Sequence, residues 1–407
     1  MALRKNKSVK SHSKKNLLPL EKSNCNFLQN AIAIVDAYGK IKPCCAYGAD
    51  DTILSVNDVD SLDDVLISGN WDNIKQNIKL SKKKFKPCKR CWDNEKLGID
   101  SLRQYAYKHN DALDQIIPDK IQYLELALDY TCNMMCRMCR PACSSKWYGA
   151  KQVNIDLEAI SAGHFRSHDL NPKEYSEKLN HIIENTDLSN LRTLQLVGGE
   201  PFYSKNFSKL MEKINKETDI SKLNFMVTTN ASIVPTDYFS LFEKFREIKI
   251  FFSIDAIGDL ANCIRWGVDF SVIDRNIDIW KSLNHNNIRF ATHSTINLQN
   301  CNKIDELLQW NKDKGIAFCP NSLTHPTYLK LNQLPLDVRK KFSLSKKLFK
   351  EIDAYENTYK ILFNSHNTEN KLAEFIKSCD ILDSYQGINF KSVNPEIYDL
   401  AKKYAVY

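Results

Sequence analysis

Three closely spaced cysteines, Cys132, Cys136 and Cys139, are the residues of this sequence best suited to chemistry. Thiolates bind iron–sulfur clusters, and three of them on one short loop can hold three irons of a 4Fe–4S cluster. The fourth iron then lacks a protein ligand and is open to a small chelating molecule. A structural zinc site is the alternative, because zinc takes four ligands and Cys143 is near enough to supply the fourth.

A second group of polar residues follows apolar, strand-like runs. Gly198-Gly199-Glu200-Pro201 comes directly after the run at 193–197. Glycines let a backbone approach a ligand closely, and a carboxylate suits an ammonium group, although the segment alone could also be a plain turn. Later runs end in Thr, Ser, Asn or Asp, for which ordinary strand-end capping is an equally good explanation. These residues are Thr229, Asn230, Ser253, Asp255, Thr295 and Asn297.

Another set of cysteines precedes the triplet: Cys25, the adjacent Cys44 and Cys45, and the pair Cys88 and Cys91. Four thiolates could fully ligate a second 4Fe–4S cluster or a structural zinc ion, and spacing alone does not separate iron from zinc. Adjacent cysteines cannot easily bind one cubane, and we expect Cys44 to be the ligand. The odd total of 13 cysteines and the lack of a visible export signal argue against a disulfide framework.

The elements that must position these residues alternate along the chain. Six strand-like runs begin with Ile121 to Tyr130, and helical spacing lies between them, as at Tyr175, Leu179, Ile182 and Ile183. Alternation of this kind predicts a parallel sheet with right-handed crossovers. Six units fall short of the eight that close a barrel, so we expect an α/β fold with an open, partial (β/α)6 barrel and its polar residues at the strand ends. The other expected strands are 193–197, 223–229, 248–254, 288–296 and 316–318.

Composition and charge divide the chain into four expected parts. The net charge of +8 is mild, and its excess lies mainly in the basic tail and near Lys82 to Arg90. No stacking motif with interleaved aromatic residues accompanies these charges, which makes nucleic-acid binding a poor explanation. No apolar run approaches the length of a membrane span, and we expect a cytoplasmic protein. The parts are a flexible basic tail (1–23), a cysteine-rich unit with a hairpin over 31–43 (24–110), the barrel (118–330) and a helical cap (331–407).

The cysteine triplet, followed by Gly-Gly-Glu-Pro at the end of the second barrel strand, resembles the radical S-adenosylmethionine (SAM) superfamily. The resemblance covers roughly residues 120–325. It implies a catalytic 4Fe–4S cluster on the triplet with SAM at its open iron, and a glycine-glycine-glutamate segment that holds the methionine amino group. The residues it implies for SAM binding are Gly198, Gly199, Glu200, Pro201, Asn230, Ser253, Asp255 and Thr295.

The N-terminal cysteines resemble the SPASM/twitch auxiliary-cluster modules of the same superfamily, which usually follow the barrel and here precede it. This resemblance implies a second 4Fe–4S cluster on Cys25, Cys44, Cys88 and Cys91. The resemblance of the triplet to the superfamily implies reductive cleavage of SAM to a 5′-deoxyadenosyl radical that takes hydrogen from a substrate. A peptide is the first expectation for that substrate, and a flavodoxin- or ferredoxin-type protein for the electron donor.

Two other functions stay open. A radical SAM enzyme could act on a sugar, a nucleotide or another small molecule, because no winged helix for peptide binding is recognisable. A non-catalytic zinc-binding interaction protein would use the basic tail and the N-terminal cysteines, although Gly-Gly-Glu-Pro at a strand end argues against it. His293, His325, Arg265 and Trp266 could contact SAM or a substrate, while a buried, hydrogen-bonded role is commoner for such histidines.

Overall fold

The computed structural model describes residues 25–36, 38–48, 50, 53–81, 85–96, 101–109, 116–161, 163–166, 171–283, 285–342 and 369–405. The expected basic tail over 1–23 lies outside these residues.

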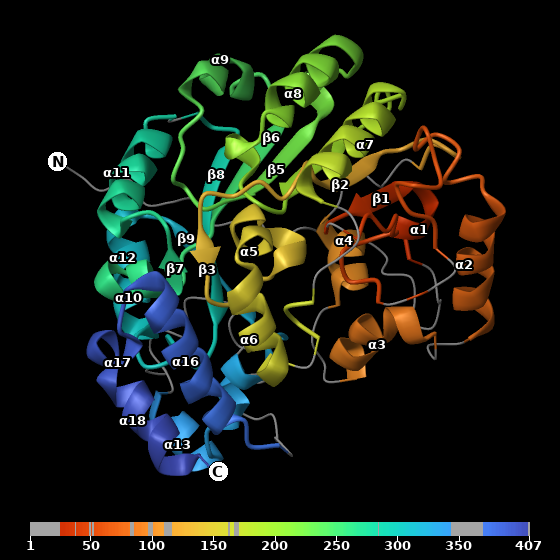
Figure 1. Cartoon of the computed structure of the whole chain (residues 1–407). Coiled ribbons are helices and arrows are strands. Elements are labelled where there is room, and N and C mark those ends of the chain that lie inside the picture. Colours follow the sequence, from red (N-terminus) through yellow and green to blue (C-terminus); the bar gives the residue numbers. More distant parts are fainter. Residues whose placement is uncertain are drawn as a thin grey trace.

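A seven-stranded parallel sheet forms the centre of the molecule (Figure 1). Each strand pairs in parallel with its neighbours, which confirms the predicted α/β fold with an open, partial barrel. The sheet has one strand more than six alternating units predict. In sheet order the strands are β1 (Ala31–Ile34), β2 (Tyr123–Ala127), β4 (Thr193–Val197), β5 (Asn224–Thr229), β6 (Glu247–Phe252), β8 (Ile288–Ile296) and β9 (Ala317–Ser322).

The additional strand is β1, which the sequence places in a hairpin over 31–43. Its ladder is parallel to β2, with Ala31 opposite Tyr123. Of the predicted hairpin, the structure has an isolated antiparallel bridge between Ala33 and Lys42. All four residues of β1 are buried, and pairing with β2 satisfies backbone groups that would be costly to leave unpaired in such a place. The cysteine-rich unit therefore contributes directly to the barrel sheet.

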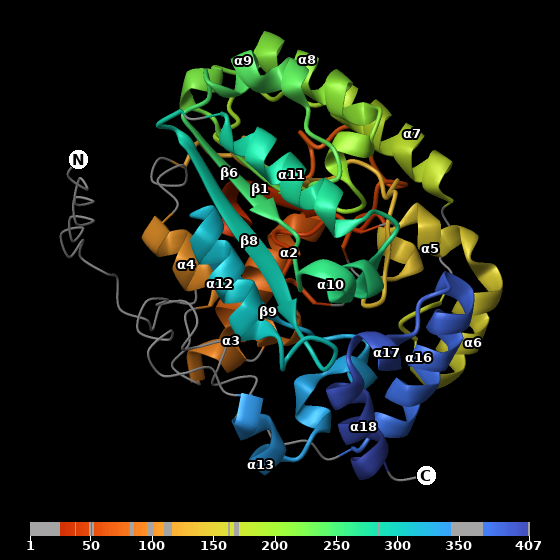
Figure 2. The same ribbon diagram turned by 90° about the vertical axis from the view of Figure 1, so that its left-hand side faces the viewer.

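Helices predicted between the strands are present and lie on the outside of the sheet (Figures 1 and 2). The first of them begins with a capping box, in which Asn171 and Glu174 exchange side-chain and backbone hydrogen bonds, and has Pro172 at its first position. The helices are α7 (Pro172–Glu184), α8 (Asn206–Glu217), α9 (Phe239–Phe242), α11 (Phe270–Lys281) and α12 (Ile304–Lys314).

The two faces of the sheet differ in burial. Along β5 and β6, buried residues alternate with half-buried ones, as expected when successive side chains point to opposite faces. The buried set, which includes Phe225 and Phe252, packs on the helices; the ring of Trp280 in α11 lies 6.2 Å from that of Phe252. The other set, which includes Met226 and Lys249, is half-buried and points to the opposite face of the sheet.

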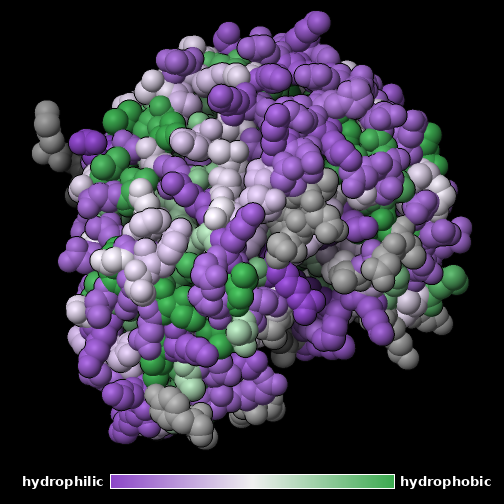
Figure 3. Space-filling model, viewed as in Figure 1, coloured by the Kyte–Doolittle hydropathy of each residue, from purple (hydrophilic) through white to green (hydrophobic). Residues whose placement is uncertain are grey.

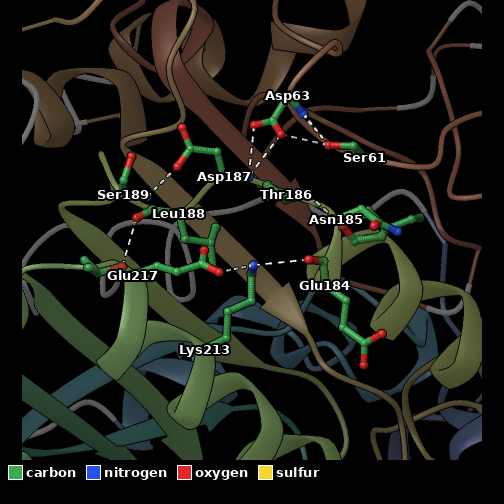
Figure 4. Close-up of polar contacts among 12 residues, drawn as sticks. Ser61, Asp63, Glu184, Asn185, Thr186, Asp187, Leu188, Ser189, Lys213 and Glu217 are labelled. Carbon is green, nitrogen blue, oxygen red and sulfur yellow. Dashed lines mark hydrogen bonds and ion pairs between the residues drawn. The ribbon is translucent and has the colours of Figure 1, made fainter.

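The N-terminal unit is joined to the barrel by polar contacts as well as by β1 (Figure 4). The Asp63 carboxylate accepts a hydrogen bond from the backbone N–H of Asp187 at 3.0 Å. The backbone N–H of Leu62 donates to the buried Thr186 hydroxyl, also at 3.0 Å. Both barrel residues directly follow α7, so this loop is the second attachment point after β1. The helices of the unit are α1 (Phe27–Asn30), α2 (Gly69–Leu80), α3 (Lys89–Lys96) and α4 (Leu102–His109).

The C-terminal helices pack beside the barrel, next to α6 (Lys151–Ser161) (Figure 1). Within the described part of the chain, no helix is both long and apolar enough to cross a bilayer. Hydrophilic side chains predominate on the face seen in Figure 3, with apolar ones in smaller groups between them. The C-terminal helices are α13 (Leu336–Arg339), α16 (Leu372–Gln386), α17 (Phe390–Val393) and α18 (Pro395–Tyr404).

Candidate active site

The three triplet thiols line one cavity of about 470 Å³ beyond the carboxyl ends of the strands. The loop that carries them follows β2. In this loop the Asp129 carboxylate accepts from the backbone N–H of Thr131 at 2.8 Å and from the Ser204 hydroxyl at 2.5 Å. The same cavity is lined by most of the other residues predicted for the site. These are Gly198, Gly199, Asn230, Ser253 and Thr295.

Segments far away in the sequence fix the backbone of the triplet loop. The two-residue strand β3 (Met135–Cys136) pairs antiparallel with β7 (Arg265–Trp266). The Trp147 indole N–H donates to the Cys136 carbonyl at 2.9 Å, and the Gln386 amide of α16 donates to the Met135 carbonyl at 3.1 Å. The thiols are thus held on a rigid loop, as a ligand set needs.

Arg137, which lies inside the triplet, is completely buried. Its Nη2 contacts the Asp383 carboxylate of α16 at 2.6 Å, and its Nε donates to the Cys263 carbonyl at 3.0 Å. Its backbone N–H donates to the Ile264 carbonyl at 2.8 Å. A buried cation is stable when it is paired and hydrogen-bonded in this way. Arg137 therefore anchors the triplet loop to the C-terminal helices.

The Gly-Gly-Glu loop packs directly on the triplet loop. Gly198 and Gly199 have φ values of 74° and 43°, and a Cβ at Gly199 would meet the Thr131 carbonyl at 2.5 Å. The Gly199 N–H donates to the Cys143 carbonyl at 3.2 Å, and the Glu200 N–H to the Thr131 carbonyl at 2.8 Å. These glycines are required because two backbones touch here, a reason that the sequence alone does not give.

Glu200 and Pro201 are buried behind the residues that line the cavity. The Glu200 carboxylate accepts from the Thr229 hydroxyl at 2.7 Å and from the Asn230 N–H at 2.6 Å. Burial raises the pKa of Glu200 to about 7, against the lowering effect of these hydrogen bonds. In this arrangement Glu200 positions the end of β5 at the cavity wall.

Asp255 is also buried and does not line the cavity. One carboxylate oxygen accepts from the backbone N–H of Thr295 at 2.6 Å, and the other contacts Arg265 Nε at 2.7 Å. Arg265 itself reaches the cavity, where its Nη1 lies 3.7 Å from Cys136 Sγ. Asp255 thus connects the ends of β6 and β8 to β7, which pairs with β3 of the triplet loop.

The cavity favours negative charge. Arg140 and Arg265 line it together with His164 and His325, and none of the described lining residues is Asp or Glu. Burial lowers the pKa of His164 to about 4, with further lowering by Arg140 and His325, so this imidazole is neutral at pH 7. Burial also raises the pKa of Cys132 to about 12, and the neighbouring Cys136 adds to that effect. Binding of a cationic metal centre would offset this cost of forming thiolates.

Cys143 faces the same cavity. Its thiol is hydrogen-bonded to the Arg140 guanidinium, which in turn lies 3.7 Å from the Asp36 carboxylate beyond β1. Four thiols therefore face one cavity, and Cys143 has a cationic partner that ties it to the N-terminal unit.

The predicted N-terminal ligands also come together. Cys25, Cys44, Cys88 and Cys91 line one small pocket of about 20 Å³, whose other walls are largely apolar. Burial raises the pKa of Cys25 to about 11 and that of Cys88 to about 12, while Arg103 lowers both. Arg103 is fixed by Glu95, with Nη2 and Oε2 2.7 Å apart.

Cys45 is absent from the residues described around that pocket. Its thiol is instead hydrogen-bonded to Glu125 of β2. Burial raises the pKa of Glu125 to about 7. The side chains of the adjacent Cys44 and Cys45 thus point to different surroundings, in keeping with the expectation that Cys44 is the ligand.

Both sets of thiols suit an iron–sulfur cluster by their donor chemistry. Within the described ranges, no three His, Cys, Asp or Glu side chains are arranged as ligands of a single metal ion. A 4Fe–4S cluster accepts ligands at separate corners of a cubane, so three thiols spread around a cavity are compatible with it. The pocket that the four N-terminal thiols line encloses only slightly more than the room for one water molecule.

Several residues of the site are not evident from the sequence. Arg137, Asp383 and Gln386 act through contacts over some 250 positions, and the sequence gives no signal for such pairs. Arg140 could have been noticed as a cation beside the third cysteine. His164 follows a helix without any motif.

No family model and no curated protein matches the chain. Solved structures that match include anSMEcpe with bound AdoMet and the Cp18Cys peptide, at 15% identity over 59% of this chain and 60% of that one, with a TM-score of 0.34. Streptococcus suis SuiB bound to S-adenosylmethionine matches at 13% identity over 60% of this chain and 51% of that one, with a TM-score of 0.35. The match thus spans three fifths or less of those proteins, and similarity at this level assigns neither reaction nor substrate.

Proposed function

We propose that this protein is a radical SAM enzyme, with a 4Fe–4S cluster on Cys132, Cys136 and Cys139 and SAM in the adjoining cavity. The observation that carries the proposal is the meeting of three thiols from one loop with the Gly-Gly-Glu loop and the polar ends of three further strands. The cavity volume of about 470 Å³ falls within the usual range for small-molecule sites, about 300–1,000 Å³.

In this proposal the residues of the chain bind the cluster and SAM, orient them and shield them from water. When bound, the cluster and SAM supply an electron and a sulfonium whose cleavage gives methionine and a 5′-deoxyadenosyl radical. Asn230, Ser253 and Thr295 offer polar groups at the cavity wall, while the cationic Arg265 suits the SAM carboxylate. The resemblance assigns Glu200 to the methionine amino group. Because Glu200 is buried and accepts a hydrogen bond from the backbone N–H of Asn230, we propose that it holds Asn230 in place beside that group.

We further propose a second metal site on Cys25, Cys44, Cys88 and Cys91. An auxiliary 4Fe–4S cluster is the first candidate, because of the resemblance to SPASM/twitch modules, and a structural zinc ion is the second. A fully ligated cluster would transfer electrons rather than bind SAM. A peptide is the proposed substrate on the same resemblance, and a small molecule such as a sugar or nucleotide is the alternative.

Cleavage of SAM by the reduced protein tests the proposed function. Reconstituted protein, incubated anaerobically with dithionite and SAM, should release 5′-deoxyadenosine and methionine, measured by chromatography. Cys136→Ala should abolish release, whereas Cys301→Ala, a buried cysteine outside both sites, should retain it. Release that is equal in wild type and Cys136→Ala would overturn the proposal, as would a wild type that holds zinc alone.

A further inference from the structure

The two-residue strand β7 (Arg265–Trp266), which we call the strap, places the Arg265 guanidinium beside one sulfur of the triplet. Arg265 lies opposite Cys136 in the β3–β7 ladder, and its Nη1 donates to Cys136 Sγ at 3.7 Å. Within the described ranges, Arg265 is the only cationic side chain for which a hydrogen bond to a sulfur of Cys132, Cys136 or Cys139 is found. The contact therefore singles out one of the three predicted ligands.

A buried carboxylate orients this guanidinium. Asp255 Oδ2 lies 2.7 Å from Arg265 Nε, and the Asp255 side chain is fully buried. Asp255 Oδ1 is fixed in turn by the backbone N–H of Thr295. With Nε held in this way, the planar guanidinium directs Nη1 to the sulfur, a geometry that a lysine ammonium cannot reproduce.

The backbone of the strap lies against the triplet loop at both ends. Gly267 has a φ of 130°, and a Cβ there would meet the Asn133 carbonyl at 2.7 Å. On the other side, the Ile264 carbonyl accepts from the Arg137 N–H at 2.8 Å. The strap thus contacts the triplet loop at both ends and is hydrogen-bonded to it at Ile264, which places Arg265 beside Cys136.

We propose that Arg265, oriented by Asp255, raises the reduction potential of the cluster on the triplet through its hydrogen bond to Cys136 Sγ. The inference rests on the proposed function. One-electron reduction adds one negative charge to the cluster, part of which resides on the cysteine sulfurs. A charge-assisted hydrogen bond to that sulfur is stronger in the reduced state, and hydrogen bonds to cluster sulfurs set such potentials. Arg265 is a positioning and tuning residue in this account.

Arg140 provides a matched control, because it carries the same charge on the wall of the same cavity. Its guanidinium contacts Cys143 and Asp36 instead of a triplet sulfur. If the effect were purely coulombic, replacing either arginine would shift the reduction potential by a similar amount. If it acts through the hydrogen bond to sulfur, replacing Arg265 should shift the potential more.

The test is an anaerobic potentiometric titration without SAM, followed by the paramagnetic resonance signal of the reduced triplet cluster. Arg265→Gln should shift the midpoint potential to more negative values by more than Arg140→Gln does. Arg265→Lys, which keeps the charge opposite Asp255 and so preserves folding, should also shift it downward. An Arg265→Gln potential equal to that of wild type or of Arg140→Gln would overturn the inference, as would an unshifted Arg265→Lys. A wild type without a cluster signal would overturn the proposed function itself.

Discussion

The two groups of cysteines differ in the space beside them. The triplet thiols face a cavity of about 470 Å³ whose walls include hydroxyl, amide and guanidinium groups. The N-terminal thiols enclose about 20 Å³, between side chains such as Phe27, Leu28 and Trp92. The first group therefore has room beside it for a small polar molecule, whereas the second group does not. We expect a reactive, open site at the first group and a fully ligated site at the second.

The two groups also differ in how the chain holds them. The N-terminal pocket is built from residues 25–103, with Arg103 fixed by Glu95. The triplet loop is held by β7 and α16, which come more than 120 residues later. A substitution in β7 or α16 should consequently disturb the triplet loop and leave the N-terminal pocket unchanged.

Replacing Cys132, Cys136 and Cys139 together with Ala should have the largest effect. Iron per chain, measured after anaerobic reconstitution, should fall from about eight to about four if both sites hold cubanes. Sulfide should fall in parallel. Four irons with one zinc in wild type would show that the N-terminal site is structural, which would increase the difference between the two sites. Unchanged iron in the variant would show that the triplet does not hold a cluster.

The adjacent Cys44 and Cys45 offer a matched pair at the other site. Cys44→Ser should remove the N-terminal metal, because Cys44 lines the pocket. Cys45→Ser should leave the metal content close to that of wild type, because its thiol contacts Glu125. Metal analysis of the two variants decides the assignment, and equal losses would refute it.

Asp383→Ala should destabilise the protein by about 3 kcal/mol, because it leaves the buried Arg137 without its carboxylate. Urea unfolding measures this effect, and iron should be lost from the triplet before the N-terminal site. Asp380→Ala on the exposed side of α16 is the control, with an expected change within about 0.5 kcal/mol. Equal changes in unfolding free energy and iron content for the two substitutions would contradict the conclusion that α16 stabilises the triplet loop.

Burial of Glu125 should make the free energy of unfolding depend on pH. Burial raises its pKa from 4.5 to about 7, so the folded protein retains this proton longer than the unfolded chain. The stability of the wild type therefore falls as pH rises from about 4.5 to about 7. Glu125→Gln should gain up to about 3 kcal/mol over wild type at pH 8 and little at pH 4.5, measured by urea unfolding.

The exposed Glu177→Gln on α7 is the control for this comparison and should show no pH-dependent difference. A Glu125→Gln difference that is the same at both pH values would contradict the effect of burial.

Periodicity and motif order predict much of this architecture. The strands before the triplet and before Gly198 are marked by apolar runs, and strand ends of a parallel sheet meet at one edge. The additional strand β1 was not predictable in this way, because four apolar residues carry no information about the sheet they join. The contacts of Arg137 with Asp383 and of Arg265 with Cys136 depend on tertiary packing, which local patterns do not encode.

The response of the reduced cluster to SAM tests the central claim most directly. The proposed open iron at the triplet would bind SAM, so addition of SAM should change the paramagnetic resonance spectrum of the reduced protein. The change should persist in Cys143→Ala, because Arg140 rather than iron is the partner of that thiol. A wild-type spectrum unaffected by SAM, and a response that appears only in Cys143→Ala, would show that Cys143 closes the fourth site and would contradict the account.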